Sequence, residues 1–118
     1  MNLDEAIQKH TAWKTKFRAA IANKETLDAA TIAKDNCCDL GKWLHGEAKP
    51  KFGNLPSYGI CLAKHKIFHA EAGKVAAAIN AKKFAEAETM IAAGTPYSHA
   101  STEAVGAIMH LQKDAKLA

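Results

Sequence analysis

A chain of 118 residues, 48% of them hydrophobic, is long enough to form one domain around a single core. The net charge of +4 comes from lysines scattered among acidic residues, so we expect no nucleic-acid interface. No run approaches the roughly eighteen apolar residues of a membrane span, and the first residues lack the pattern of a secretory signal. We therefore expect a cytoplasmic protein with one domain over residues 1–118.

The composition favours helices, because alanine is abundant, there are only three prolines and β-branched residues never alternate. Apolar residues at helical spacing predict a first helix over residues 3–21, with His10 inside its apolar stripe. A break at residues 23–26 leads to a second predicted helix, capped by Thr26 or Asp28 and ending near Gly46. Its apolar face contains Ala30, Ala33, Cys37, Leu40, Gly41 and Leu44.

Glycines and prolines in residues 46–56 predict a loop with at most one short turn. A long third helix follows, with a stripe of about six turns. The stripe contains Tyr58, Cys61, Leu62, His65, Phe68, His69, Ala72, Val75, Ala76 and Ile79. A short helix over residues 84–93 should stop at Gly94, and Thr95 followed by Pro96 predicts the start of the last helix. Short connections then favour an all-α, antiparallel four-helix bundle with an additional short helix.

Three histidines interrupt these apolar stripes. His65 and His69 are four residues apart in one predicted helix, so both imidazoles can reach a single ion. Any one buried histidine is most simply a core residue hydrogen-bonded to a backbone carbonyl. Three inward histidines, with His10 as the third, favour a shared metal ion, because an unpaired buried imidazole is unfavourable. The other histidines fall off the stripes and should be solvated: His45, His99 and His110.

The fourth ligand is expected to be a thiolate, and the spacing leaves three candidates open. An odd number of cysteines in a reducing compartment argues against a disulfide framework. Cys37 lies at the centre of the apolar face of the second predicted helix, and Cys38 lies about 100° further round. Cys61 precedes His65 by one turn and is either a structural residue or a thiol near the site.

The sequence around these residues resembles the chemoreceptor zinc-binding (CZB) domain of bacteria over nearly the whole chain. The resemblance rests on CDLGKWL at residues 38–44, HTAWK at residues 10–14 and HKIFH at residues 65–69. It implies that His10, Cys38, His65 and His69 bind Zn²⁺. It therefore selects Cys38 over Cys37, contrary to the stripe.

The same resemblance implies a role in bacterial signal transduction and chemotaxis. CZB domains are typically attached to chemoreceptors or diguanylate cyclases, where zinc modulates output and the ligand cysteine can be oxidised. We therefore expect a sensor of zinc or of oxidant, read by such a signalling partner. The family also implies a possible homodimer, because the proteins that carry these domains act as dimers.

A site with three histidines and one cysteine has four protein ligands and leaves no position for water, so we expect no enzyme activity. The histidine pair also encloses Lys66, Ile67 and Phe68, without the glutamate of the His-Glu-x-x-His proteases. One alternative is a haem or di-iron bundle protein, although no Glu-x-x-His pairs lie on the stripes. The other is a metal-free helical interaction module.

Overall fold

The computed structural model describes residues 1–117, which contain eight helices and no strand. In chain order they are α1 (Leu3–Thr11), α2 (Trp13–Asn23), α3 (Ala29–Ile32), α4 (Asp39–His45), α5 (Ala48–Phe52), α6 (Pro56–Asn80), α7 (Phe84–Met90) and α8 (Pro96–Asp114). The predicted all-α class is confirmed.

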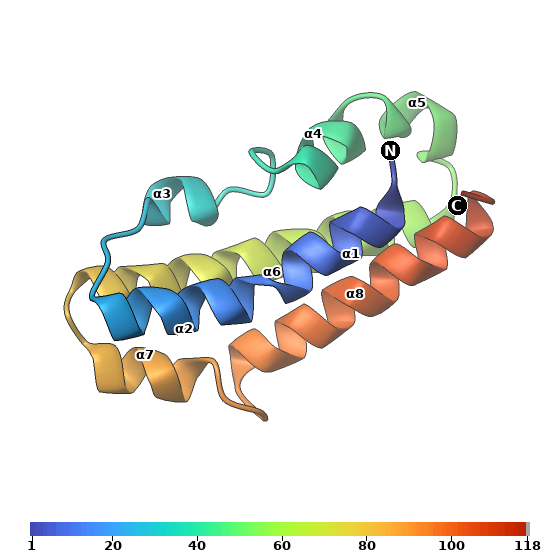
Figure 1. Cartoon of the computed structure of the whole chain (residues 1–118). Helices are drawn as coiled ribbons and strands as arrows, with labels where there is room; N and C mark the ends of the chain where they lie inside the picture. The colour runs from blue at the N-terminus through green and yellow to red at the C-terminus, as the bar shows by residue number, and fades with distance from the viewer. Residues whose placement is uncertain (118) are drawn as a thin grey trace.

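The helices form four arms that run alternately in opposite directions (Figure 1). Helices α1 and α2 make the first arm, α3 to α5 the second, α6 the third and α8 the fourth. Helix α7 is the additional short helix and connects α6 with α8. The first, third and fourth arms are long helical rods, whereas the second arm consists of short helices that pack along them. The antiparallel bundle is thus as predicted, with a broken second arm.

The first predicted helix, over residues 3–21, is divided at Ala12 into α1 and α2. The Thr11 hydroxyl donates a 3.0 Å hydrogen bond to the Gln8 carbonyl, a contact that competes with the helix ladder and bends helices. Ala12 keeps right-handed angles, so the two helices continue in nearly one direction. His10 therefore lies on the last turn of α1, just before the bend.

The continuous second helix predicted to end near Gly46 is wrong. Helix α3 has only four residues, opened by Asp28, whose carboxylate accepts from the Thr31 N–H at 3.2 Å. The chain then leaves the helical conformation over residues 33–38, where Asp35 and Asn36 are residue types that favour turns. Cys38 is extended, with φ −79° and ψ 163°, and acts as the N-cap of α4. The five-residue α5 lies inside the predicted loop.

The third and fifth predicted helices are confirmed as α6 and α8. Thr95 caps α8 by accepting the Ser98 N–H at 3.2 Å, and Pro96 takes the first helical position. Helix α7 ends at Met90, three residues before the predicted limit. Gly94 has φ +81°, a left-handed conformation that only glycine adopts readily, and it turns the chain into α8.

The buried apolar residues form two clusters, one at each end of the bundle. One includes Phe17, Ile32, Phe68, Val75 and Tyr97; the other includes Leu3, Leu40, Leu44, Cys61 and Ile108. Along their arms, His10, Cys38 and His65 fall between the residues of the two clusters. A layer of polar side chains thus separates the two apolar cores.

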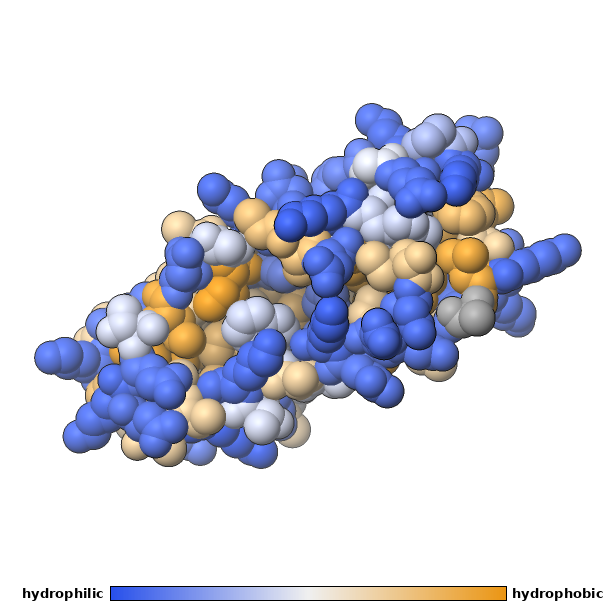
Figure 2. Space-filling model, turned by 45° about the horizontal axis from the view of Figure 1, so that its top comes forward, coloured by the Kyte–Doolittle hydropathy of each residue, from blue (hydrophilic) through white to orange (hydrophobic). Residues whose placement is uncertain are grey.

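Hydrophilic side chains are spread over the face seen in Figure 2, with hydrophobic atoms in separate areas between them. None of the helices in residues 1–117 combines the length and the apolar character that a membrane span requires.

Candidate metal centre

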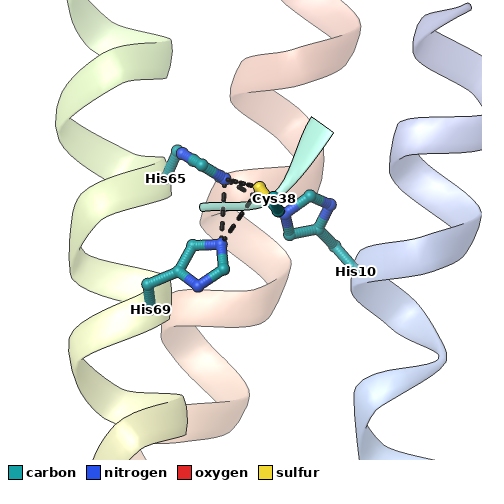
Figure 3. Close-up of side chains that lie close together, drawn as sticks. All are labelled: His10, Cys38, His65 and His69. Carbon is teal, nitrogen blue, oxygen red and sulfur yellow. Dashed lines mark hydrogen bonds between the residues drawn. The ribbon is translucent and has the colours of Figure 1, made fainter. Parts of the chain in front are cut away.

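Four side chains from three arms converge in the polar layer (Figure 3). His10 comes from α1, His65 and His69 lie one turn apart on α6, and Cys38 stands at the start of α4. One ligand atom of each lies within 4.8 Å of those of the others. The structure therefore brings together all four residues that the resemblance predicted as zinc ligands. The sulfur comes from the broken second arm and faces three imidazoles on the rods.

Five of the six separations between these ligand atoms are close to those of a tetrahedral zinc site, and the sixth, between His10 and His69, is within 4.8 Å. The Nε2 atom of His65 lies 3.1 Å from Nε2 of His10 and 3.0 Å from Nε2 of His69. The Cys38 Sγ atom lies 3.8, 3.3 and 3.5 Å from Nε2 of His10, His65 and His69. Tetrahedral zinc places its nitrogen ligands about 3.3 Å apart and a nitrogen and a sulfur about 3.5 Å apart. The four atoms thus surround a space of the size that Zn²⁺ requires.

Backbone carbonyls fix two of the imidazoles in the form that binds metal. Nδ1 of His10 donates to the Ala6 carbonyl at 2.6 Å, and Nδ1 of His69 donates to the Ile32 carbonyl at 2.8 Å. Because a carbonyl only accepts, the proton of each neutral ring lies on Nδ1 and the lone pair on Nε2. Both lone pairs therefore point toward the centre of the cluster.

Without a cation the nitrogens of this cluster are poorly paired, because the only donors near the Nε2 lone pairs of His10 and His69 are the His65 ring and the weakly donating Cys38 thiol, whose Sγ lies 3.8 and 3.5 Å from them. His65 is fully buried, and its Nδ1 has no hydrogen-bond partner among the described residues. If its single proton is on Nε2, it can serve only one of the two neighbouring lone pairs. If the proton is on Nδ1, three lone pairs face one another and a buried N–H is unpaired. A metal ion at the centre removes the lone-pair repulsion, so the residues fit zinc.

Burial is the main reason why these imidazoles stay neutral. It lowers the pKa of His10 and His69, although their backbone hydrogen bonds act in the opposite direction. For His65, burial and the charges of His69 and His10 lower the pKa to about 3. Neutral imidazoles are the form that binds metal, so the histidines are ready to bind zinc at neutral pH.

The Cys38 thiol has the opposite requirement. Burial raises its pKa above the ordinary value, while the Gly41 N–H, which donates to Sγ at 3.3 Å, partly opposes the rise. The thiol is therefore protonated at neutral pH when no metal is bound. Because a coordinated thiol is deprotonated outright, zinc binding releases this proton.

The lowered histidine pKa values predict that the metal-free protein loses stability in mild acid. Between pH 6.5 and about 3, the unfolded chain binds a proton at His65 that the folded chain does not, so stability falls as pH falls. At pH 5 this residue alone lowers the free energy of unfolding by about 2 kcal/mol. Urea unfolding of metal-free protein at pH 7.5 and pH 5 measures the difference. Equal stability at both values would contradict the buried neutral state of His65.

Two glycines hold the second arm close to the site. A Cβ atom on Gly41 would lie 1.7 Å from the backbone oxygen of Asp35, and one on Gly73 would lie 2.6 Å from Cβ of Ala33. The first contact lies within the second arm, at Asp35, and the second joins Ala33 to α6, so both restrict the segment that carries Cys38. The sequence contains no signal for the contact at Gly73, because its neighbour Ala33 is distant in the chain.

A hydrogen-bonded contact between side chains that the sequence did not predict also braces this segment. Nε2 of His45 lies 2.9 Å from Oδ2 of Asp35. Burial alone would raise the pKa of Asp35, but the contact with His45 lowers it overall. His45 is solvent-exposed as predicted, and so are His99 and His110.

The other two cysteines lie outside the cluster. Cys37, placed at the centre of an apolar face by the predicted periodicity, is exposed; that placement is wrong because no helix forms at residues 33–38. Cys61 is fully buried in the second apolar cluster, and burial raises the pKa of its thiol to about 12. Such a thiol is unreactive, which agrees with a structural role.

Comparison with known families agrees with this geometry. Residues 10–76 match the chemoreceptor zinc-binding domain, and this range includes all four clustered residues. No curated protein and no solved structure matches the chain. The match covers more than half of the sequence. On this evidence the chain belongs to the CZB family of regulatory, zinc-binding domains.

Proposed function

We propose that the chain forms one regulatory domain over residues 1–118, in which His10, Cys38, His65 and His69 bind a single zinc ion. The observation that carries the proposal is the convergence of three Nε2 atoms and one sulfur, with five of their six separations close to those of tetrahedral zinc. The three Nε2 atoms that face one another without a cation between them also support it. Because the cluster has no carboxylate among the described residues, it suits zinc better than a di-iron centre.

The proposed role is sensory and not enzymatic. The family is regulatory, and catalytic zinc sites keep one coordination position for water or substrate. Here four protein ligands fill the tetrahedron. Zinc itself supplies no redox chemistry, so the useful property of the site is whether it is occupied and whether its thiolate is intact.

Zinc occupancy would control the position of the second arm. The ion joins Cys38 on this arm to histidines on α1 and α6. Without it, residues 33–38 lose their bond to the rods and the polar layer is left with unsatisfied imidazoles. Loss of the ion would therefore act on the short non-helical segment over residues 33–38, which would be the element that switches.

Oxidation of Cys38 would give the same response to a different signal. The residue is only partly buried, so a small oxidant can reach its sulfur. Hydrogen peroxide would transfer one oxygen to the thiolate, giving sulfenic acid and hydroxide. The oxidised sulfur is a poor zinc ligand, so the metal would leave.

We propose a cytoplasmic setting, a homodimer and a chemoreceptor or diguanylate cyclase partner on the basis of the family alone.

Metal analysis of protein purified without added metal or a histidine tag tests the ligand set. We expect about one zinc per chain, lost in Cys38→Ala and in His65→Ala, because a three-ligand remnant binds zinc far more weakly. His99→Ala, at an exposed histidine, should keep its zinc. Protein without zinc, but with full thermal stability, would favour the metal-free interaction module.

The same zinc-loaded protein tests oxidant sensing. Mild peroxide should release zinc and add one oxygen to Cys38, both detectable by mass spectrometry. An unmodified Cys38 with zinc retained would remove the oxidant from the proposal and leave zinc availability as the signal.

A further inference from the structure

A pocket of about 490 Å³ lies beside the metal centre, between α1 and the segment that carries Cys38. Its wall includes Ala6, Trp13 and Leu40, and its mouth includes the Lys9–Asp39 ion pair, whose Nζ and Oδ2 atoms are 3.1 Å apart. Two of the four clustered residues, His10 and Cys38, line this pocket, whereas His65 and His69 do not. The site is therefore open to solvent from one side.

Because the pocket reaches only one side of the site, the four clustered residues differ in their exposure to solvent. His65 and His69 are 0% and 3% exposed and project from the middle of α6, whereas Cys38 is only partly buried. His10 is 4% exposed and so is also buried, and a molecule that delivers or removes zinc through the pocket meets Cys38 first. Transfer from such a molecule requires an intermediate in which zinc has left some ligands and not yet bound the others, and a further donor atom at the mouth would stabilise it.

Cys37 provides that donor. It lines the pocket beside Cys38 and also a shallow groove on the other side, so it stands on the rim between them. Its thiol is exposed and makes only a long, 3.5 Å contact with Oδ1 of Asn36. It therefore does not contribute to the core. One imidazole and two thiols, from His10, Cys37 and Cys38, thus line one cavity, and Cys37 is not needed in the resting site.

We propose that zinc enters and leaves through this pocket and that Cys37 binds it transiently during exchange. The inference rests on the proposed function, because it takes the four clustered residues as the resting ligands. In loading, a bond from zinc to the delivering molecule breaks as a bond to Sγ of Cys37 forms, and the thiol proton passes to solvent. That bond then breaks as Nε2 of a buried histidine binds, and Cys37 is reprotonated. The zinc oxidation state does not change.

Stopped-flow exchange with a chromogenic chelator tests the proposal. Zinc removal is measured from loaded protein, and loading is measured from the zinc–chelator complex. In Cys37→Ser we expect both rates to fall by on the order of tenfold, because a hydroxyl is a much weaker zinc ligand than a thiolate. Since a transient ligand changes forward and reverse rates equally, the zinc affinity should not change. Cys61→Ala, at the other cysteine outside the cluster, is the matched control and should exchange at the wild-type rate.

A second measurement uses the wild-type chain. Methyl methanethiosulfonate should cap Cys37 alone in loaded protein, because Cys61 is buried and Cys38 is bound to zinc. The cap should slow exchange, and reductant should restore it. Unchanged rates in both experiments, or a loss of affinity without slower loading, would overturn the transient role. Failure of the ligand set itself would be seen separately, as zinc retained in Cys38→Ala.

Discussion

Replacing Gly41 with alanine is expected to abolish tight zinc binding and to destabilise the fold. The new Cβ would lie 1.7 Å from the Asp35 carbonyl oxygen and 2.8 Å from its carbon. Backbone atoms cannot rotate away as a side chain can, so the turn before Cys38 must move. We expect a loss of about 3 kcal/mol in the free energy of unfolding. Because the Gly41 N–H also donates to Sγ of Cys38, zinc affinity should fall by about 100-fold.

Gly59→Ala is the matched control for this substitution. Gly59 lies in α6, is exposed, and has no atom within 4 Å of the position that a Cβ would occupy. Alanine should stabilise that helix by roughly 0.5–1 kcal/mol and leave zinc affinity unchanged. Chemical denaturation of the metal-free forms, with competitive zinc titration, measures both quantities. Wild-type affinity in Gly41→Ala would show that the close approach to Asp35 does not position Cys38.

Gly73→Ala is expected to weaken zinc binding from a distance. Its new Cβ would lie 2.6 Å from Cβ of Ala33 and would push α3 away from α6. The carbonyl of Ile32, which orients His69 by accepting from Nδ1, would move with α3. Loss of a hydrogen bond that orients a metal-binding histidine typically lowers affinity by about tenfold or more. Overpacking should also lower the free energy of unfolding by about 2 kcal/mol.

A compensating change distinguishes this mechanism from general destabilisation. In Gly73→Ala combined with Ala33→Gly, the atom that clashes most severely, Cβ of Ala33 just after α3, is removed. Zinc affinity and stability should therefore recover in part, and the coupling should appear in a double-mutant cycle. Independent, additive effects of the two substitutions would mean that the contact between α3 and α6 does not orient His69.

The long helices could be predicted from the sequence because their signals are local. In α6, the stripe from Tyr58 to Ile79 repeats at helical spacing, and nearly all of its residues are buried as expected. In α8, Thr95 and Pro96 mark the first turn by capping and by a fixed backbone angle. Each signal acts within a few residues, so it does not depend on the rest of the chain.

The second arm could not be predicted in the same way. Its apolar residues repeat at helical spacing, but the chain breaks over residues 33–38 so that Ile32 reaches one apolar cluster and Leu40 the other. The break also places the Asp35 carbonyl against Gly41 and turns Cys38 inward. In a continuous helix these residues would not meet in this way, so helical periodicity could not predict the contacts.

The sequence by itself determined the all-α class, the inward positions of His10, His65 and His69, and the spacing that lets two of them share an ion. These properties follow from side-chain periodicity within single helices. Periodicity did not choose among the cysteines; only the resemblance to a family pointed to Cys38. The tertiary structure decided which sulfur faces the histidines, because that depends on where a non-helical segment crosses the rods. It also decided which carbonyls orient the imidazoles and which side of the site is open to solvent.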